Sequence, residues 1–374
     1  MSPANRSSWF DRGIEIVGWA AAAVALLFQN PYGELGPEAD RFLVLQALAL
    51  VAVILAVVGA ARRSPPAAQP ARRALAGLAS SPIARWALAL GGAGALTAAL
   101  SVDPLRSLFG APPRLFGFAS ELALLLLFLL LVPRLASVDS RERWETALLA
   151  ASGALVAYAL LQWVGLDPLR WQVDWQGRPT AAQGNPLFLA QALAWLVPIA
   201  AGRAVCRWRA GEHRAAMSAA LLAVLAGGVL VRTGARGPLL GLAVAALVFA
   251  AVAGLGSPFA RPRRAGVALA SLLGLALIAG AWVALQRSDR LSGTASQRLL
   301  LWSSVVRLFE TSPPHRLVVG FGAESLPIVL PPHLPPELPE RIWRPDLYHD
   351  RAHNAVLDAL AAGGLLRLLA GVGL

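Results

Sequence analysis

Residues 42–60 read FLVLQALALVAVILAVVGA, an apolar run with no charged side chain. A helix of about 20 such residues crosses the roughly 30 Å hydrocarbon core of a membrane, where lipid offers no hydrogen-bond partner to free backbone groups. The rest of the chain has the same character, since 57% of its 374 residues are hydrophobic and 14% are charged. A soluble domain has about 25% charged residues. The sequence therefore predicts an all-α, polytopic membrane protein and argues against a water-soluble enzyme.

Working outward from this run, we predict about ten transmembrane helices. They cover residues 13–28, 42–60, 83–100, 116–132, 146–165, 187–202, 216–231, 239–255, 265–284 and 353–374. The first resembles the apolar core of a signal peptide, but Asn30-Pro31-Tyr32 follows it in place of a small-residue cleavage site, so we interpret it as a span. The chain then divides into a bundle of about nine spans at 1–284, a long loop at 285–352 and a last span at 353–374.

Arginine supplies all 33 basic residues, and the formal net charge is +12. In a polytopic membrane protein, an arginine excess in short loops marks the cytoplasmic side. Alternate short loops hold 17 and 7 arginines, which predicts a cytoplasmic N-terminus and an outer location for the 285–352 loop. The lone Cys206 then lies in a reducing compartment. Because the arginines have this use, we expect no nucleic-acid partner.

The long outer loop carries its own structural signals. Ser292 or Ser296 can cap a helix that ends at Pro313-Pro314, and a proline-rich stretch at 327–345 is unsuited to regular helix. Apolar residues recur at helical spacing in the predicted helix, namely Leu299, Trp302, Val305, Val306 and Phe309. We expect this helix to lie along the membrane surface.

Four of the five histidines, His315, His333, His349 and His353, fall in the same loop. His353-Asn354 opens the last apolar run, which places an imidazole at the outer interface, where it can act as a base near neutral pH. The alternative is a polar helix-start residue that faces lipid headgroups. His349 and His353 are one helical turn apart and form a candidate metal pair, but no glutamate lies between them as in an H-E-x-x-H motif. We therefore expect no metal.

Arg236 lies between two apolar spans on the predicted outer side. Arginines in short loops are usually on the cytoplasmic side, so an arginine on the outer side is expected to have an anionic partner. Phosphate is a suitable partner, because the planar guanidinium can bind two of its oxygens at once. The alternative is an interfacial arginine that reaches lipid headgroups. Gly234 and Gly237 indicate a broken or closely approached backbone, and Arg298 carries a similar, weaker argument. Glu121 is the one acidic residue clearly inside a mid-chain span, and we expect it to lie at the interface or to pair with a neighbouring arginine rather than relay protons.

Taken together, the motifs resemble the O-antigen ligase and O-antigen polymerase family of bacterial membrane glycosyltransferases. The matching segments are Ser101-Val102-Asp103-Pro104 with Gly110 and Arg114, Gly177-Arg178, Gly184-Asn185-Pro186, Thr233-Gly234-Ala235-Arg236-Gly237, Arg298 with Trp302, Gly320-Phe321-Gly322 and His353-Asn354. Each is weak alone, but their order around a long outer loop is fairly specific. The resemblance covers most of residues 95–365.

The resemblance implies a metal-independent membrane glycosyltransferase fold in the bacterial inner membrane, with no cofactor. It implies a donor glycan on a lipid diphosphate of the undecaprenyl type and a hydroxyl acceptor on a second lipid-linked or surface glycan, as in lipopolysaccharide synthesis. By motif position, Arg236 and Arg298 would hold the donor diphosphate, and His353 would deprotonate or orient the attacking hydroxyl. Arg178 and Asn185 would also bind substrate.

Three alternatives stay open at this point. A polymerase of the same family would extend its own donor. A transporter for a lipid-linked sugar would place charged sites near mid-membrane on repeated halves, whereas the candidates here cluster at one face and no internal repeat is visible. A non-catalytic assembly subunit is the third alternative. Family members usually continue for further spans, so we expect that the chain ending at Leu374 is truncated or degenerate, with full activity in doubt.

Overall fold

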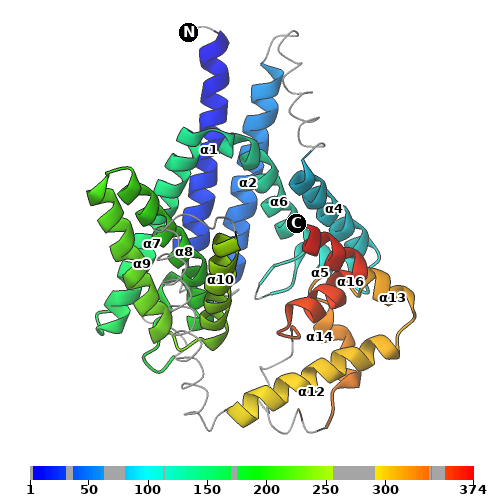
Figure 1. Ribbon diagram of the computed structural model, residues 1–374. Coiled ribbons are helices and arrows are strands. Elements are labelled where there is room, and N and C mark those ends of the chain that lie inside the picture. Colours follow the sequence, from blue (N-terminus) through cyan, green and yellow to red (C-terminus); the bar gives the residue numbers. More distant parts are fainter. Residues whose placement is uncertain are drawn as a thin grey trace. The chain divides into compact units, whose positions relative to one another are not determined.

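The structure is a computed structural model that describes residues 3–30, 37–62, 81–112, 114–169, 175–255, 291–336, 338 and 350–374 (Figure 1). Within these ranges all regular secondary structure is helical, which confirms the all-α class. The predicted span at 265–284 and the side chain of His349 lie outside the described residues.

Ten helices of 14 residues or more form the body of the described chain. They are α1 (Pro3–Leu27), α2 (Pro37–Ala61), α4 (Pro82–Ala99), α6 (Phe118–Leu131), α7 (Val138–Trp163), α8 (Pro186–Arg209), α9 (His213–Arg232), α10 (Arg236–Leu255), α12 (Leu291–Glu310) and α16 (Ala355–Gly373). Shorter helices and 3-10 turns connect them, namely α5 (Pro104–Phe109), η2 (Val132–Ala136), η3 (Ala181–Gln183), α13 (His315–Val319), α14 (Leu326–Val329) and η4 (Pro331–His333).

A repeated local rule starts three of these helices. Ser81, Asp103 and Asn185 each cap a helix with a side-chain oxygen, and a proline follows at the first helical position. The capping oxygen accepts a hydrogen bond from a backbone N–H that the helix leaves unpaired, and proline has no such N–H to lose. The start of α12 was predicted differently: Ser292 and Ser296 lie inside the helix, which already begins at Leu291, so their predicted capping role is wrong.

Six helices of the described chain are long and apolar enough to cross a membrane. They are Glu38–Ala61, Phe118–Leu135, Val138–Trp163, Pro186–Arg209, His213–Arg232 and Ala355–Gly373. The predicted spans at 13–28, 83–100 and 239–255 lie on α1, α4 and α10, which are helical but fall outside this set. The polytopic helical character predicted from the sequence is therefore confirmed.

The chain divides into two compact units. Unit 1 comprises Met1–Ala25, Tyr32–Trp144 and Ser292–Leu374. Within it α2 and α4 pack on α6, and α4 and α13 pack on α16. One core cluster joins α1, α2 and α6 around Val17, Ala52 and Leu127, and a second joins α12 to the segment before α16 around Val305 and Phe321.

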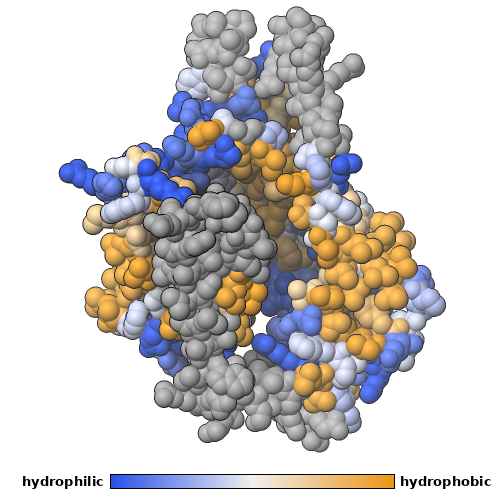
Figure 2. Space-filling view, viewed as in Figure 1, coloured by the Kyte–Doolittle hydropathy of each residue, from blue (hydrophilic) through white to orange (hydrophobic). Residues whose placement is uncertain are grey.

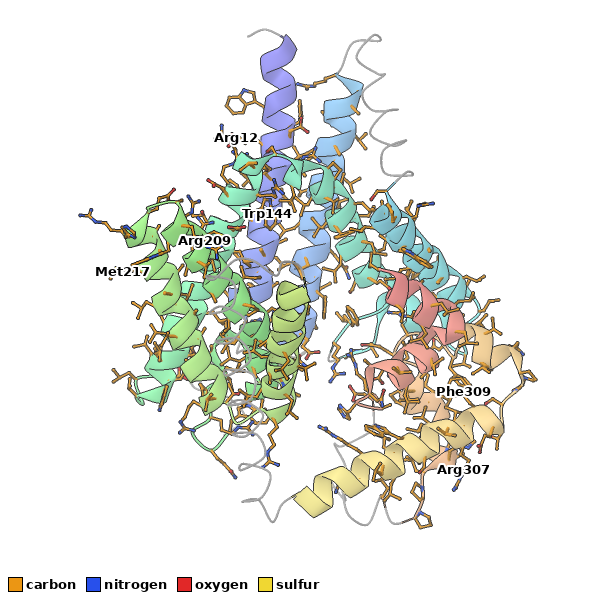
Figure 3. The ribbon with its side chains drawn as sticks, viewed as in Figure 1. Arg12, Trp144, Arg209, Met217, Arg307 and Phe309 are labelled. Atoms are coloured by element: carbon orange, nitrogen blue, oxygen red, sulfur yellow. The ribbon has the colours of Figure 1, made fainter. Side chains whose placement is uncertain are left out.

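The buried face of α12 differs from the predicted stripe. Trp302, Val305 and Phe309 pack into the second cluster of unit 1, but Leu299 and Val306 are exposed. The ring of Phe309 lies 5.3 Å from that of Phe321 between centroids, and Arg307 lies on the opposite side of the helix (Figure 3). The helix is therefore apolar on more than one side, and its location along the membrane surface remains a prediction.

Unit 2 comprises Leu26–Pro31 and Glu145–Leu291. Helices α9 and α10 both pack on α8, around a core cluster that includes Leu155, Leu193 and Leu230. Exposed Met217, Leu221, Val224 and Val231 follow one another at helical spacing on the outer face of α9, where Met217 points away from the unit (Figure 3).

Hydrophobic side chains also gather on the surface of the molecule in the space-filling view (Figure 2). Three examples on candidate spans are Trp195, Val224 and Leu50. Their side chains are 75%, 70% and 61% exposed, respectively. An exposed apolar face of this kind is unfavourable in water and is suited to contact with lipid.

Candidate functional site

The loop before α16 holds His353 in an unusual backbone conformation. His353 has a φ of 53°, a left-handed value that is costly for a residue with a Cβ atom. The next residue, Asn354, caps α16: its Oδ1 accepts hydrogen bonds from the N–H groups of Val356 at 3.0 Å and Leu357 at 3.3 Å. The side chain of His353 is exposed, so the imidazole is available to a substrate.

Asp358 fixes the peptide groups on both sides of His353. Its Oδ1 accepts a hydrogen bond from the N–H of Ala352 at 2.7 Å, and its Oδ2 accepts one from the N–H of Asn354 at 3.2 Å. Bonds to an ionised carboxylate are among the stronger ones in proteins, and here they oppose the cost of the left-handed backbone. The sequence analysis missed Asp358, although an acidic residue in the first turn after a capping asparagine is a recognisable signal.

Arg298 and His353 belong to segments that are joined directly. Trp302 on α12 donates its indole N–H to the carbonyl of Ala352, the residue before His353, at 2.9 Å. Arg298 precedes Trp302 by four residues, which places the two side chains on the same helical face, and Arg298 is exposed. The predicted pairing of Arg298 with Trp302 thus has a structural meaning, because the tryptophan anchors the histidine loop to the helix that carries the arginine.

The Gly320-Phe321-Gly322 motif inserts into a break in the last helix. Helix α16 loses helical geometry at Gly363 and Gly364, and the N–H of Phe321 donates to the carbonyl of Ala361 at 2.8 Å. A Cβ atom on Gly320, whose φ is 69°, would come within 2.6 Å of the nitrogen of Gly363. The glycine is required here because two backbones approach without room for a side chain.

Gly322 also packs too closely for a side chain, in this case against the connection between α4 and α5. A Cβ atom there would lie 2.0 Å from the Oγ of Ser101 and 2.2 Å from that of Ser107. Ser101 donates to the carbonyl of Phe321 at 2.9 Å, and Ser107 donates to that of Ala323 at 3.1 Å. Two motifs that are more than 200 residues apart in the sequence are therefore one structural element.

In unit 2, Arg178 and Arg236 lie around the turn between α9 and α10. The Nε of Arg178 donates to the carbonyl of Thr233 at 2.5 Å, and Gly234 has a φ of 65°. A Cβ atom on Gly234 would lie 3.6 Å from the Arg178 guanidinium, an ordinary contact distance, so the left-handed φ supports the predicted break in the backbone and not a close approach. At Gly237 the predicted close approach is wrong, because nothing lies within 4 Å. Burial lowers the pKa of the Arg178 guanidinium from its ordinary value.

Arg236 is the first residue of α10, with Pro238 in the first turn as predicted. A helix N-terminus offers unpaired N–H groups and a partial positive charge, which favour an anion. Asn185 also lies in unit 2, where its Oδ1 caps α8 by accepting from the N–H of Leu187 at 2.8 Å. This oxygen has a structural use, and substrate binding by Asn185 remains a prediction.

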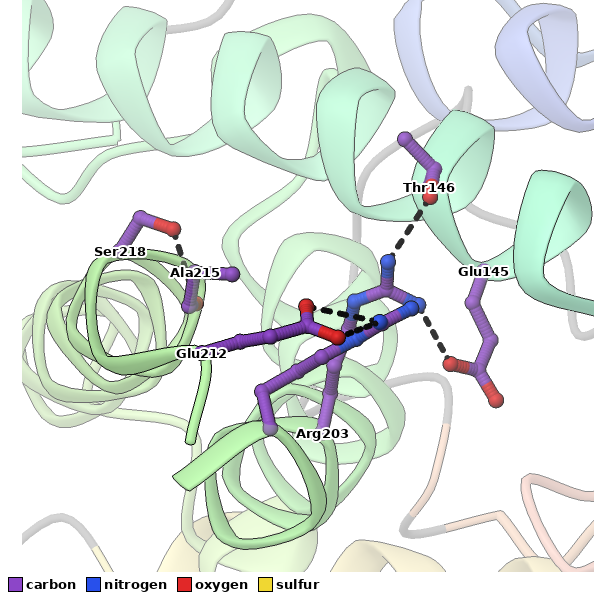
Figure 4. Close-up of polar contacts among 7 residues, drawn as sticks. Glu145, Thr146, Arg203, Glu212, Ala215 and Ser218 are labelled. Carbon is purple, nitrogen blue, oxygen red and sulfur yellow. Dashed lines mark hydrogen bonds and ion pairs between the residues drawn. The ribbon is translucent and has the colours of Figure 1, made fainter. Parts of the chain in front are cut away.

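Several other arginines have local partners. Arg367 pairs with Glu121 at 3.1 Å, which confirms the predicted pairing of that carboxylate with an arginine. Arg203 pairs with Glu145 at 2.6 Å and donates to the Thr146 hydroxyl at 2.9 Å (Figure 4). These contacts hold the two guanidinium groups against acidic or hydroxyl side chains in the folded chain.

The described residues contain no group of three histidine, cysteine, aspartate or glutamate side chains that could hold a metal ion. The proposed partner of His353 in a metal pair, His349, lies outside those residues. The predicted site residues fall in both units: Arg178, Asn185 and Arg236 in unit 2, and Arg298 and His353 in unit 1.

The fold is that of a helical membrane protein, in which Arg236 opens a helix and His353 lies just before one. Residues 221–370 match the family model described as O-antigen ligase. The match runs from α9 to α16 and contains Arg236, Arg298 and His353, whereas Arg178 and Asn185 precede it. The match covers less than half of the chain, and it agrees with the resemblance found in the sequence. Neither a curated protein nor a solved structure matches the chain significantly.

Proposed function

We propose that this chain transfers a glycan from a lipid diphosphate, of the undecaprenyl type, to a sugar hydroxyl of a lipid-linked or surface acceptor, as an O-antigen ligase does. The observation that carries the proposal is the family match at 221–370, which contains the predicted base and two of the predicted phosphate ligands in one segment. The reaction needs a base, a stabilised leaving group and two lipid-borne substrates, and a membrane protein with these residues meets each need.

His353 is the proposed base. Its imidazole accepts the proton of the acceptor hydroxyl, whose oxygen forms a bond to the anomeric carbon of the donor sugar. The bond between that carbon and the diphosphate oxygen breaks, and the lipid diphosphate leaves with the electron pair. The fixed backbone on both sides of His353 supports this role, because a general base must be held within hydrogen-bond reach of the proton it removes.

Arg236 and Arg298, with Arg178, are the proposed ligands of the diphosphate. A guanidinium fork binds two phosphate oxygens at once, and fixed positive charge stabilises the charge that develops on the leaving group. The position of Arg236 at the N-terminus of α10 adds the helix dipole to this effect. Diphosphate is a good leaving group, so arginines suffice where other transferases use a metal.

We place this chemistry on the outer face of the inner membrane, with the N-terminus in the cytoplasm. The contacts of Ser101 and Ser107 with residues 321–323 support this topology. The arginine count predicts that both segments are in outer loops, and their direct contact is expected only if they lie on the same side. On the predicted inner side, Arg134 pairs with Asp11 and Arg143 pairs with Glu15.

Transport of a lipid-linked sugar is the competing activity, and the break in α16 is the feature that would favour it, since transporters bind substrates at interrupted helices. Here, however, the carbonyl of Ala361 that the break exposes accepts a hydrogen bond from Phe321 of the same chain. The backbone of Phe321 therefore already fills the hydrogen-bonding position at the break that a transported substrate would use.

The test is glycan transfer by the purified protein, given a lipid-diphosphate-linked donor and a glycolipid acceptor. Arg236→Lys keeps the charge and loses the fork, so donor affinity should fall by about tenfold or more while insertion is unchanged. Arg207→Lys is the matched control, because Arg207 pairs with Glu212 at 2.8 Å in the connection between α8 and α9. Equal donor affinity in all three proteins would refute phosphate recognition by Arg236. Absence of transfer by the wild type in its natural membrane would refute the enzyme.

A further inference from the structure

Unit 1 contains a cavity of about 240 Å³ next to the histidine loop. Its walls come from α5 and the segment after it, from residues 322–327, from the loop before α16 and from α16 itself. The volume is below the roughly 300–1,000 Å³ of pockets for drug-sized ligands, so it is suited to one small polar unit rather than to a long chain.

The cavity is lined by four arginines and three carboxylates, but most of these charges already have partners. Glu324 accepts hydrogen bonds from the N–H groups of Ala111 and Phe116, and Asp358 accepts two from the histidine loop. Asp350 pairs with Arg114. Another arginine in the cavity wall, Arg367, pairs with Glu121.

Two wall arginines are left without a carboxylate among the described residues, Arg106 and Arg351. The Nε of Arg106 is buried and has no hydrogen-bond partner in the part of the chain that the structure describes. A buried donor without an acceptor is unfavourable, and a ligand that supplies an acceptor removes the penalty. The guanidinium of Arg351 lies 5.8 Å from the centre of the Phe116 ring, which also lines the cavity. The charges in the cavity wall that have no opposite charge among the described residues are thus the two guanidinium groups, and the aromatic ring of Phe116 lies beside one of them.

The cavity is close to the proposed base by chain connectivity. Arg351 and His353 are two residues apart, so their Cα atoms are at most about 7 Å apart. Asp358 both lines the cavity and holds the peptides that flank His353. His353 itself does not line the cavity, so a group bound there would lie beside the imidazole and not on it.

We propose that this cavity binds a phosphate-bearing sugar unit of the acceptor glycan, held by Arg106 and Arg351, and thereby presents a neighbouring hydroxyl to His353. The proposal rests on the proposed function, because it assigns the acceptor of that reaction. It specifies an anionic acceptor, whereas the donor diphosphate has its own arginines. Arg106 and Arg351 satisfy the phosphate oxygens, and Phe116 packs against the apolar face of the ring.

The first experiment measures binding and requires no turnover. Glucose 6-phosphate, glucose and inorganic phosphate are titrated into the purified full-length protein in nanodiscs of neutral phosphatidylcholine. Glucose 6-phosphate should bind at least about tenfold more tightly than glucose or phosphate alone. Arg106→Gln and Arg351→Gln should each weaken it by about tenfold or more, and Arg207→Gln, the matched control, should not.

Equal affinity for inorganic phosphate and glucose 6-phosphate would overturn the sugar assignment and leave a simple anion site. Loss of glucose 6-phosphate binding on adding phosphatidylglycerol to the nanodiscs would overturn it in favour of a lipid headgroup. Unchanged glucose 6-phosphate affinity in both glutamine variants would refute the proposal that this cavity is the binding site.

The second experiment separates this proposal from the proposed function. In the transfer assay, Arg351→Gln should raise the KM for a phosphorylated acceptor and leave the KM for the lipid-diphosphate donor unchanged. Transfer that proceeds with an unaltered acceptor KM would overturn the cavity proposal while the function stands. Specific glucose 6-phosphate binding in a protein that transfers nothing would support the cavity and refute the function.

Discussion

Asp358 holds the histidine loop, so its removal should reduce catalysis without touching the reacting atoms. Asp358→Ala deletes both hydrogen bonds to the peptides that flank His353. Hydrogen bonds to a charged group contribute about 1.5–3 kcal/mol each, and the left-handed backbone of His353 costs about 1–3 kcal/mol. Without these bonds nothing opposes the backbone strain, which at about 3 kcal/mol favours an open loop over the competent loop by about 100-fold.

We therefore expect Asp358→Ala to reduce the turnover number by about 100-fold, with donor affinity unchanged. Asp358→Asn keeps one acceptor oxygen and loses the charge, so its loss should be smaller, about tenfold. The assay is glycan transfer at saturating donor, with loop opening measured by hydrogen exchange at the N–H groups of Ala352 and Asn354. Glu212→Ala, which breaks an exposed ion pair worth less than about 1 kcal/mol, is the control.

Full turnover in Asp358→Ala would refute the claim that this carboxylate positions the base. Faster exchange at Ala352 and Asn354 with unchanged turnover would show that the loop is held but that its geometry is irrelevant to the reaction.

Three further predictions follow from the same geometry. His353→Ala should lower turnover by about 10²- to 10⁴-fold and leave donor affinity intact, and inhibition of the wild type by chelators would instead favour a metal site. Gly320→Ala should lower the melting temperature in detergent, because its Cβ atom would meet the backbone of Gly363, whereas Gly153→Ala, with nothing within 4 Å, should not. Pro331→Cys in a Cys206→Ser background should react with an impermeant thiol reagent in intact cells, and labelling only after permeabilisation would invert the topology.

The fold class could be predicted from the sequence because burial in lipid imposes a simple requirement. Runs such as residues 42–60 must be helical to satisfy their backbone groups, and the structure has a helix there. Helix starts with a cap and a proline, as at Asn185-Pro186, are equally local signals. The buried face of α12 was only partly predicted, since apolar residues on more than one side of the helix obscure which side packs against protein.

The candidate site residues could be named from the sequence, but the residues that hold them in place could not. His353, Arg236 and Arg298 stand out by charge and position, and Gly234 was correctly interpreted as a break in the helical backbone. Asp358 and the break at Gly363 were missed, because their roles depend on contacts with the histidine loop and with residues 318–321. No periodicity or spacing rule encodes a carboxylate that bonds backwards to two peptides, or a helix that another loop interrupts.

The insertion of Gly320-Phe321-Gly322 between the α4–α5 connection and the break in α16 bears on how the protein is made. Residues 101–107 leave the ribosome long before residues 320–322, and residues 361–364 come last of the three. A nascent chain without its last helix would present Gly320 and Phe321 with no partner for the Phe321 N–H. Membrane quality control would then recognise unit 1 as unfinished until α16 is inserted. Substitutions at Gly363 or Gly364 should accordingly shorten the cellular lifetime of the whole chain, even though neither residue lines the cavity.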